Sequence, residues 1–109
     1  MITKGLVYAR SATGENLDIQ AERGVKELRN LGITDIDVII SDYHKTKKID
    51  RPDLNGYTHL YLQGLYRIGR DRDAIPYIKD TLADGVTIVI EHGTIVTPLL
   101  AEVMFTWQI

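Results

Sequence analysis

Apolar residues along this chain repeat with two different periods, and each period predicts one kind of element. Short continuous apolar runs are typical of strands that are buried on both faces of a parallel sheet. Apolar residues three and four positions apart are typical of helices with one buried face. The runs lie at residues 5–10, 36–42, 58–65 and 86–91. The helical spacing covers residues 17–31, the later part of 67–85, and 97–109.

Residues that start or stop helices stand at the ends of these stretches. Gly32 follows the first helical stretch and predicts its C-terminal end. Asp71 or Asp73 can cap the start of the second. Thr97 comes directly before Pro98, a pair that predicts a capped start for the last helix.

The resulting order is strand, helix, strand, strand, helix, strand and helix, with a long loop at residues 43–57 before the third strand. Strands that alternate with helices favour a mostly parallel sheet covered on both faces. We therefore predict an α/β fold of three layers, in which a mostly parallel sheet of four strands, or five, is flanked by helices.

Composition narrows the class of protein. The chain has 109 residues, 44% of them hydrophobic and 26% charged, which predicts one globular domain. It has no cysteine, and its three histidines do not show metal-ligand spacing, so we expect no disulfide, metal or cofactor. No segment approaches the roughly 18 apolar residues that cross a bilayer. We expect a soluble, cytoplasmic protein with no membrane contact. A formal charge of -2 excludes a generally basic coat for nucleic acid but permits a locally basic site.

Cationic residues follow several of the predicted strands. Open α/β sheets bind ligands beyond the carboxyl ends of their strands. Arginine offers fixed, paired donors to phosphate oxygens, so arginines gathered at this edge predict a phosphate site. The candidate segments are residues 10–13, 42–51, 67–70 and 92–94. A second basic group within the long loop could contact a DNA backbone or could simply be solvated: His44, Lys45, Lys47 and Lys48.

Three motifs occur in a fixed order. The first is YAR at residues 8–10 with LDIQ at 17–20, the second is DRP at 50–52, and the third is YRIGRD at 66–71. A helix, GVTIVIE and HGTI follow the third motif. Together they resemble the catalytic domain of the serine recombinases, the resolvase and invertase family, from about residue 4 to the C-terminus. The resemblance implies a resolvase-like fold for the whole of residues 1–109.

The resemblance also implies a function, which is site-specific DNA recombination without a metal. In this family a serine hydroxyl attacks a DNA phosphodiester and becomes joined to the DNA end. Such chemistry needs preorganised cations to stabilise the charge that develops on phosphorus. The resemblance assigns that role to Arg10, Arg51, Arg67 and Arg70, and it assigns Gln20 to positioning. DNA is the implied partner.

This sequence departs from the family pattern at the reacting group. The family serine stands two residues after the first arginine, where this chain has Ala12. Ser11 lies at the family's distance from Gln20, so it is the candidate nucleophile, with Thr13 as a distant substitute. The acidic residue that opens the third motif is replaced by Tyr66. These changes predict weakened DNA cleavage.

The final helix is the candidate partner surface. The resemblance implies that the chain ends within the start of the family's oligomerisation helix, without the DNA-binding domain that follows it. Large apolar residues near a chain end, with little chain to cover them, predict a homodimer through this helix. They are Leu99, Leu100, Val103, Met104 and Trp107.

Two other interpretations stay open. A resolvase fold without catalysis would leave a module that binds DNA or protein. Alternatively, the segment SATGEN at residues 11–16, between a strand and a helix, resembles the phosphate loop of flavodoxin-like proteins that bind FMN. That alternative leaves LDIQ, DRP and the arginines of YRIGR without a role. His92 is interpreted as a structural turn residue in every case.

Overall fold

The computed structural model describes residues 3–10, 17–41, 51–68 and 73–108, except the side chains of residues 66 and 104–108. The strands are β1 (Gly5–Arg10), β2 (Ile36–Ser41), β3 (His59–Tyr61), β4 (Thr87–Ile90) and β5 (Thr94–Ile95). The α-helices are α1 (Leu17–Asn30), α3 (Ala74–Ala83) and α4 (Pro98–Gln108), and the 3-10 helices are η1 (Leu65–Ile68) and η2 (Glu91–Gly93). The predicted order of strands and helices is therefore confirmed.

The strands form a five-stranded mixed sheet in the order β2-β1-β3-β4-β5. β1 pairs in parallel with both β2 and β3, and β3 pairs in parallel with β4. Only β5 is antiparallel, because it returns from β4 through a tight turn. His92 in that turn has φ 68°, a left-handed conformation that non-glycine residues seldom adopt outside turns. The α/β class is confirmed, with the fifth strand present and the sheet mixed.

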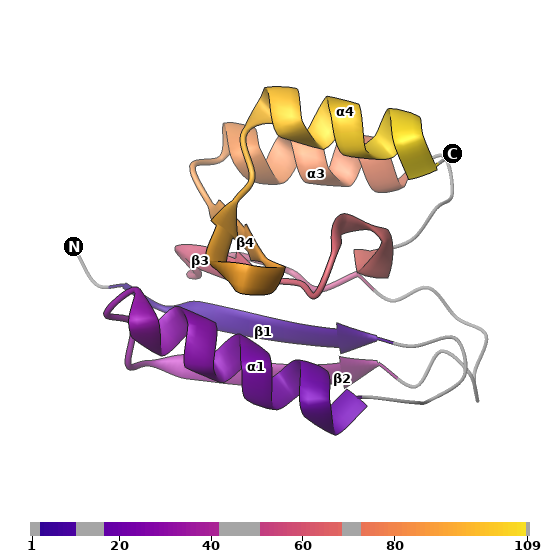
Figure 1. Ribbon diagram of the computed structural model, residues 1–109. Helices are drawn as coiled ribbons and strands as arrows, with labels where there is room; N and C mark the ends of the chain where they lie inside the picture. Colours follow the sequence, from indigo (N-terminus) through magenta and orange to yellow (C-terminus); the bar gives the residue numbers. More distant parts are fainter. Residues whose placement is uncertain (1–2, 11–16, 42–50, 69–72, 109) are drawn as a thin grey trace.

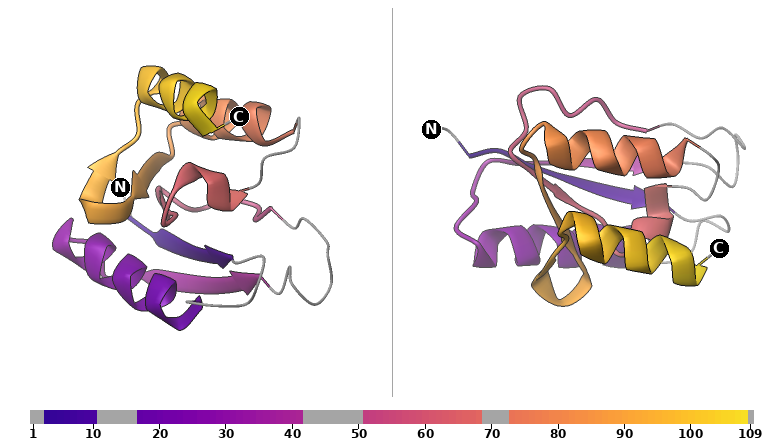
Figure 2. Two further views of the ribbon diagram at one scale, coloured as in Figure 1. Left: turned by 45° about the vertical axis from the view of Figure 1, so that its right-hand side comes forward. Right: turned by 90° about the horizontal axis from the view of Figure 1, so that it is seen from above.

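Helices cover both faces of the sheet (Figures 1 and 2). Because successive side chains of a strand point to opposite faces, β1 contributes to two separate cores. Leu6 and Tyr8 belong to the core that also contains Ile78 of α3 and Ala101 of α4. Val7 belongs to the core on the α1 side, with Leu28, Ile33, Tyr61 and Val89.

Helix α1 lies unusually close to the sheet, and Gly24 makes this possible. A Cβ atom at Gly24 would lie 2.5 Å from Val7 Cγ1 and 2.6 Å from Tyr61 Cδ1. Those distances are far below van der Waals contact, so a larger side chain would push the helix outward. This close contact fixes the position of α1 along the direction of β1 and β3, with Gly24 above Val7 and Tyr61.

The second strand is not buried, contrary to the prediction. β2 forms one edge of the sheet, and three consecutive apolar side chains of it remain 41–48% exposed: Val38, Ile39 and Ile40. The helices α3 and α4 cover the other half of the sheet (Figure 2). An apolar run therefore marked the strand correctly but not its position in the sheet.

The ends of the last helix agree with the sequence pattern where they are described. Thr97 Oγ1 accepts a hydrogen bond of 3.1 Å from the backbone N–H of Leu100, which is the expected N-terminal cap. Leu99 and Val103 of α4 are 71% and 45% exposed.

Among the described residues, no helix has the length and apolar character required to cross a membrane.

Candidate functional site

Arg10 ends the strand β1, which lies between β2 and β3, and is 9% exposed. It follows Tyr8 by two positions, so its side chain leaves the sheet on the face covered by α3 and α4. Its guanidinium Nη1 donates a hydrogen bond of 3.1 Å to the backbone carbonyl of Arg67. These two residues are 57 positions apart in the sequence. The fold thus joins the ends of two motifs at the carboxyl edge of the sheet.

Gln20, in the first part of α1, makes hydrogen bonds to both the N–H and the carbonyl of the Arg10 backbone. Its Oε1 accepts a 3.1 Å hydrogen bond from the Arg10 N–H, and its Nε2 donates a 3.1 Å bond to the Arg10 carbonyl. Gln20 is only 1% exposed. A side-chain amide that exchanges two bonds with one residue imitates a neighbouring strand, which fixes the end of β1. Gln20 therefore positions the end of β1, whereas its expected role in positioning a phosphate stays a prediction.

Arg67 lies in η1, directly after β3, and its side chain is also oriented by an amide. Gln63 Oε1 accepts hydrogen bonds from Arg67 Nε at 3.1 Å and from Arg67 Nη2 at 2.7 Å. The Gln63 carbonyl in turn accepts the Glu91 N–H at 3.3 Å, which links the loop to the end of β4. Because Gln63 is neutral, this pair of bonds orients the guanidinium without cancelling its charge.

Arg51 reaches the same face of the sheet through its neighbour Pro52. The hydroxyl of Tyr77 in α3 donates a 2.7 Å hydrogen bond to the Pro52 carbonyl. Burial, followed by the nearby Tyr8 side chain, raises the pKa of Tyr77 to about 12, and the Arg51 charge opposes this rise. Tyr77 also packs against the core that contains Tyr8. Pro52 is thus held against α3, on the face of the sheet where Tyr8 is buried.

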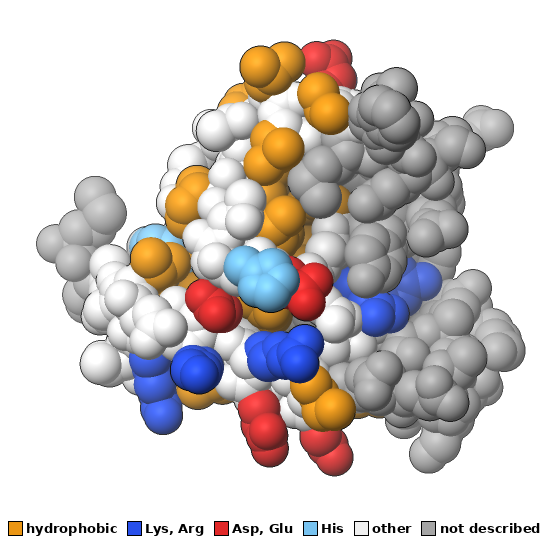
Figure 3. All heavy atoms as spheres, viewed as in Figure 1, with side chains coloured by type: hydrophobic (Ala, Val, Ile, Leu, Met, Phe, Trp, Pro, Cys, Tyr) orange, Lys and Arg blue, Asp and Glu red, His pale blue; other side chains and the backbone are white. Residues whose placement is uncertain are grey.

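Together these contacts define the arginine site, which is formed by Arg10 and Arg67 and held by Gln20 and Gln63. Arg51 directly precedes Pro52, which Tyr77 holds on the same face of the sheet. Figure 3 shows basic side chains at this end of the molecule, beside the atoms drawn in grey. The Arg67 guanidinium is oriented by an amide oxygen and the Arg10 guanidinium by a backbone carbonyl. Guanidinium groups oriented in this way are suited to bind an oxyanion, because little conformational freedom is lost when it binds.

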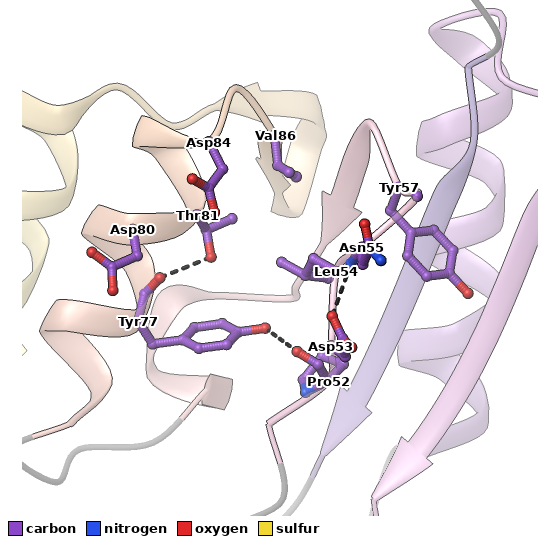
Figure 4. Close-up of a pocket in the computed structure, with 11 residues that line it drawn as sticks. Pro52, Asp53, Leu54, Asn55, Tyr57, Tyr77, Asp80, Thr81, Asp84 and Val86 are labelled. Atoms are coloured by element: carbon purple, nitrogen blue, oxygen red, sulfur yellow. Dashed lines mark hydrogen bonds between the residues drawn. The ribbon is translucent and has the colours of Figure 1, made fainter.

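A separate groove of about 570 Å³ runs between α3 and residues 52–57 (Figure 4). Three exposed carboxylates line it, those of Asp53, Asp80 and Asp84. Asp53 Oδ1 accepts a 3.0 Å hydrogen bond from the Asn55 N–H, so this carboxylate helps to shape its own loop. Figure 4 shows the Tyr77 ring along one wall, with its hydroxyl toward Pro52. This acidic groove repels phosphate and is unsuited to the predicted ligand.

The arginine site includes two residues that the sequence did not single out, Gln63 and Tyr77. Gln63 stands four positions before Arg67, a spacing that hints at contact only once the segment is known to be helical. The predicted nucleophile Ser11, its substitute Thr13 and the fourth arginine, Arg70, lie outside the described residues. So do the basic loop residues 44–48 and the side chain of Tyr66.

On the other face, charges of both signs surround the β4–β5 turn. Glu91 Oε1 lies 3.7 Å from Arg23 Nη1 and 3.8 Å from His92 Nε2. Exposed pairs of this kind contribute little to stability. Within the described ranges, no group of three or more histidine, aspartate or glutamate side chains could hold a metal ion.

Comparison with known proteins adds no family assignment. No protein-family model matches the chain, and no curated protein matches it significantly. The function must therefore be inferred from the residues and their geometry.

Proposed function

We propose that this chain is a serine recombinase-like domain that holds a DNA phosphodiester at the carboxyl edge of its sheet. The observation that supports this proposal most strongly is the contact between Arg10 and Arg67. It brings the YAR and YRIGRD motifs together at the place where a parallel sheet binds its ligands. The paired bonds from Gln20 and Gln63 give both arginines defined positions.

The proposed chemistry is transfer of a phosphoryl group to Ser11. The serine oxygen forms a bond to phosphorus and gives up its proton, while a bond between phosphorus and a deoxyribose oxygen breaks. The departing oxygen takes a proton and leaves as a free hydroxyl. Arg10, Arg51, Arg67 and Arg70 stabilise the additional negative charge on the phosphate oxygens.

We propose that this activity is weak. Ala12 stands where the family places its serine, and Tyr66 replaces an acidic residue. A nucleophile that is displaced by about 1 Å can lose on the order of 100-fold in rate. Binding depends on the arginines instead and is retained.

The proposed protein is cytoplasmic and associates through α4. The exposure of Leu99 and Val103, on an eleven-residue helix at the chain end, supports this part of the proposal. Exposed apolar side chains that gather on one element often mark a binding surface.

The test is to incubate the protein with supercoiled DNA that carries the sequences flanking its own gene. After denaturation, protein that remains joined to a DNA end is measured. We expect a small amount of adduct that disappears in Ser11→Ala and persists in Thr13→Ala. An adduct that persists in Ser11→Ala would assign the wrong nucleophile. DNA binding without any adduct would leave a non-catalytic module, and absence of both would overturn the proposal.

A further inference from the structure

β2 lies at one edge of the sheet. β2 is the terminal strand of the sheet order, so one side of its backbone has no strand neighbour within the described ranges. Val38, Ile39 and Ile40 follow one another and point alternately to the two faces of the sheet, each of them 41–48% exposed. Edges of monomeric proteins are normally protected by charges, proline or short length. β2 has six residues and no lysine or proline. Its one charged side chain, that of Asp37, pairs with Lys4 and accepts a hydrogen bond from the Tyr57 hydroxyl.

The flank of α1 beside β2 continues this surface. A hollow of about 550 Å³ runs along the helix there. Arg23 and Glu27, on the opposite flank of α1, lie against Glu91 and Gly93 at the β4–β5 turn, so the flank with the hollow faces the β2 side. The residues that line it are Ala21, Glu22, Val25, Lys26, Arg29 and Asn30. Small and apolar residues thus form the part near the sheet, and charged residues form the outer rim.

The charges on this rim are ordered along the helix. Asp18 and Glu22 are exposed in the first half of α1, and Lys26 and Arg29 are exposed in the second half. If a second α1 lay alongside in the opposite direction, each acidic half would face a basic half. A surface that complements itself in this way is what a two-fold dimer requires.

The middle of α1 also lies beside the middle of β2, measured along the strand direction. The midpoint between Glu22 and Lys26 is Gly24, which lies directly over Val7. Val7 pairs in register with Val38, close to the middle of β2. One two-fold axis perpendicular to the sheet, passing beside Val38, would therefore relate two antiparallel β2 strands and two antiparallel α1 helices together.

From this geometry we infer that a second copy of this chain binds at the α1/β2 flank, the surface formed by β2 and the rim of α1. The two sheets join through antiparallel β2 strands, and Glu22 of each copy faces Lys26 of the other. This inference does not depend on the proposed recombinase activity, and it uses a different surface from α4.

Disulfide trapping tests the inference directly, because the natural chain has no cysteine. Val38→Cys places a thiol next to the proposed axis. Leu31→Cys is the matched control, because Leu31 is 46% exposed and Val38 is 43% exposed, but Leu31 lies beyond the end of α1. A disulfide needs Cβ atoms about 3.5–4.5 Å apart, so Val38→Cys should form covalent dimers at least about tenfold faster under mild oxidation. Equal rates for the two variants would overturn the inference.

A charge exchange provides the second test, measured by analytical ultracentrifugation of the whole chain. Glu22→Lys and Lys26→Glu should each raise the dimer dissociation constant by about tenfold, since each creates two like-charge contacts across the axis. The double variant should restore it, and Lys79→Glu on the exposed side of α3 should leave it unchanged. Ile39→Lys should produce monomers at this surface. Because α4 is proposed as a separate association surface, these variants are compared in a chain that also carries Leu99→Lys. Dimers that survive Ile39→Lys in that chain would overturn the inference, as would a Leu99→Lys chain that is monomeric at about 100 μM.

Discussion

The arginine site and the acidic groove lie on the same side of the sheet but differ in how they hold their charges. The acidic groove encloses about 570 Å³, and the carboxylates that line it are exposed to solvent. The arginine site has fixed donors, because neutral amides or backbone groups orient Arg10 and Arg67. Exposed charges are screened within about 10 Å by physiological salt, whereas partly buried ones are screened less.

This difference shows why the acidic groove is not the better candidate for the functional site. An anion that binds at the arginine site meets donors already held in place, whereas the groove offers it only repulsion. Tyr77 connects the two regions, since its ring lines the groove and its hydroxyl holds Pro52 next to Arg51. Substitutions of Gln20, Arg67 and Tyr77 therefore test whether the arginine site, rather than the acidic groove, binds the ligand.

The largest effect is expected from Gln20→Leu. This change removes two buried hydrogen bonds to the Arg10 backbone, and loss of a buried hydrogen-bond partner costs about 1–3 kcal/mol. We expect the free energy of unfolding to fall by about 3 kcal/mol in urea titrations followed by circular dichroism. Gln63→Leu is the matched control, because Gln63 binds a side chain rather than a strand end, and it should cost less than about 1 kcal/mol. Equal losses in the two variants would show that the strand end is held in another way.

A smaller effect is expected from Arg67→Gln, this time on DNA affinity. Loss of one phosphate contact should weaken binding to a short duplex by about tenfold at moderate salt and reduce the salt dependence of log K by about one. Asp80→Asn, in the acidic groove, should change affinity by less than about twofold, because that carboxylate is exposed and screened. The comparison fails if fluorescence anisotropy shows the larger change for Asp80→Asn.

The sequence predicted the kinds of element well because those depend on local periodicity. The spacing from Leu17 to Leu28 identified α1, and Thr97 with Pro98 identified the start of α4. The same reasoning was wrong about β2. An apolar run looks the same in a central strand and in an edge strand, and only the order β2-β1-β3-β4-β5 separates them.

The site was predictable only as far as its motifs extend. Arg10, Gln20 and Arg67 belong to recognisable patterns, and the structure brings them together. Gln63 and Tyr77 have no such pattern, because their importance comes from contacts made across the fold. A glutamine four residues before an arginine, or a tyrosine in a helix, is ordinary until its tertiary partner is known.

The smallest effect is expected from Tyr77→Phe, which removes the hydrogen bond to Pro52 and should lower the free energy of unfolding by about 1 kcal/mol near neutral pH. This difference should depend on pH. Tyr77 has its pKa raised from 10.0 to about 12 in the folded protein, first by burial and then by Tyr8. Below pH 10.0 the hydroxyl is protonated in both folded and unfolded chains, so its contribution to stability is complete.

As the pH rises from 10.0 toward about 12, the unfolded chain gives up the Tyr77 proton while the folded chain retains it, so the stabilisation is progressively lost. Urea midpoints at pH 8 and pH 11 should therefore show the natural protein losing its advantage over Tyr77→Phe. Burial also raises the pKa of Tyr61, but that residue is present in both proteins, so its contribution cancels in the difference.

DNA affinity provides a second measurement on the same variant. If Tyr77 positions Arg51 through Pro52, Tyr77→Phe should weaken binding by about twofold to threefold with an unchanged salt slope, because no charge is removed. A variant that loses stability equally at both pH values and binds DNA normally would show that Tyr77 belongs to the acidic groove alone.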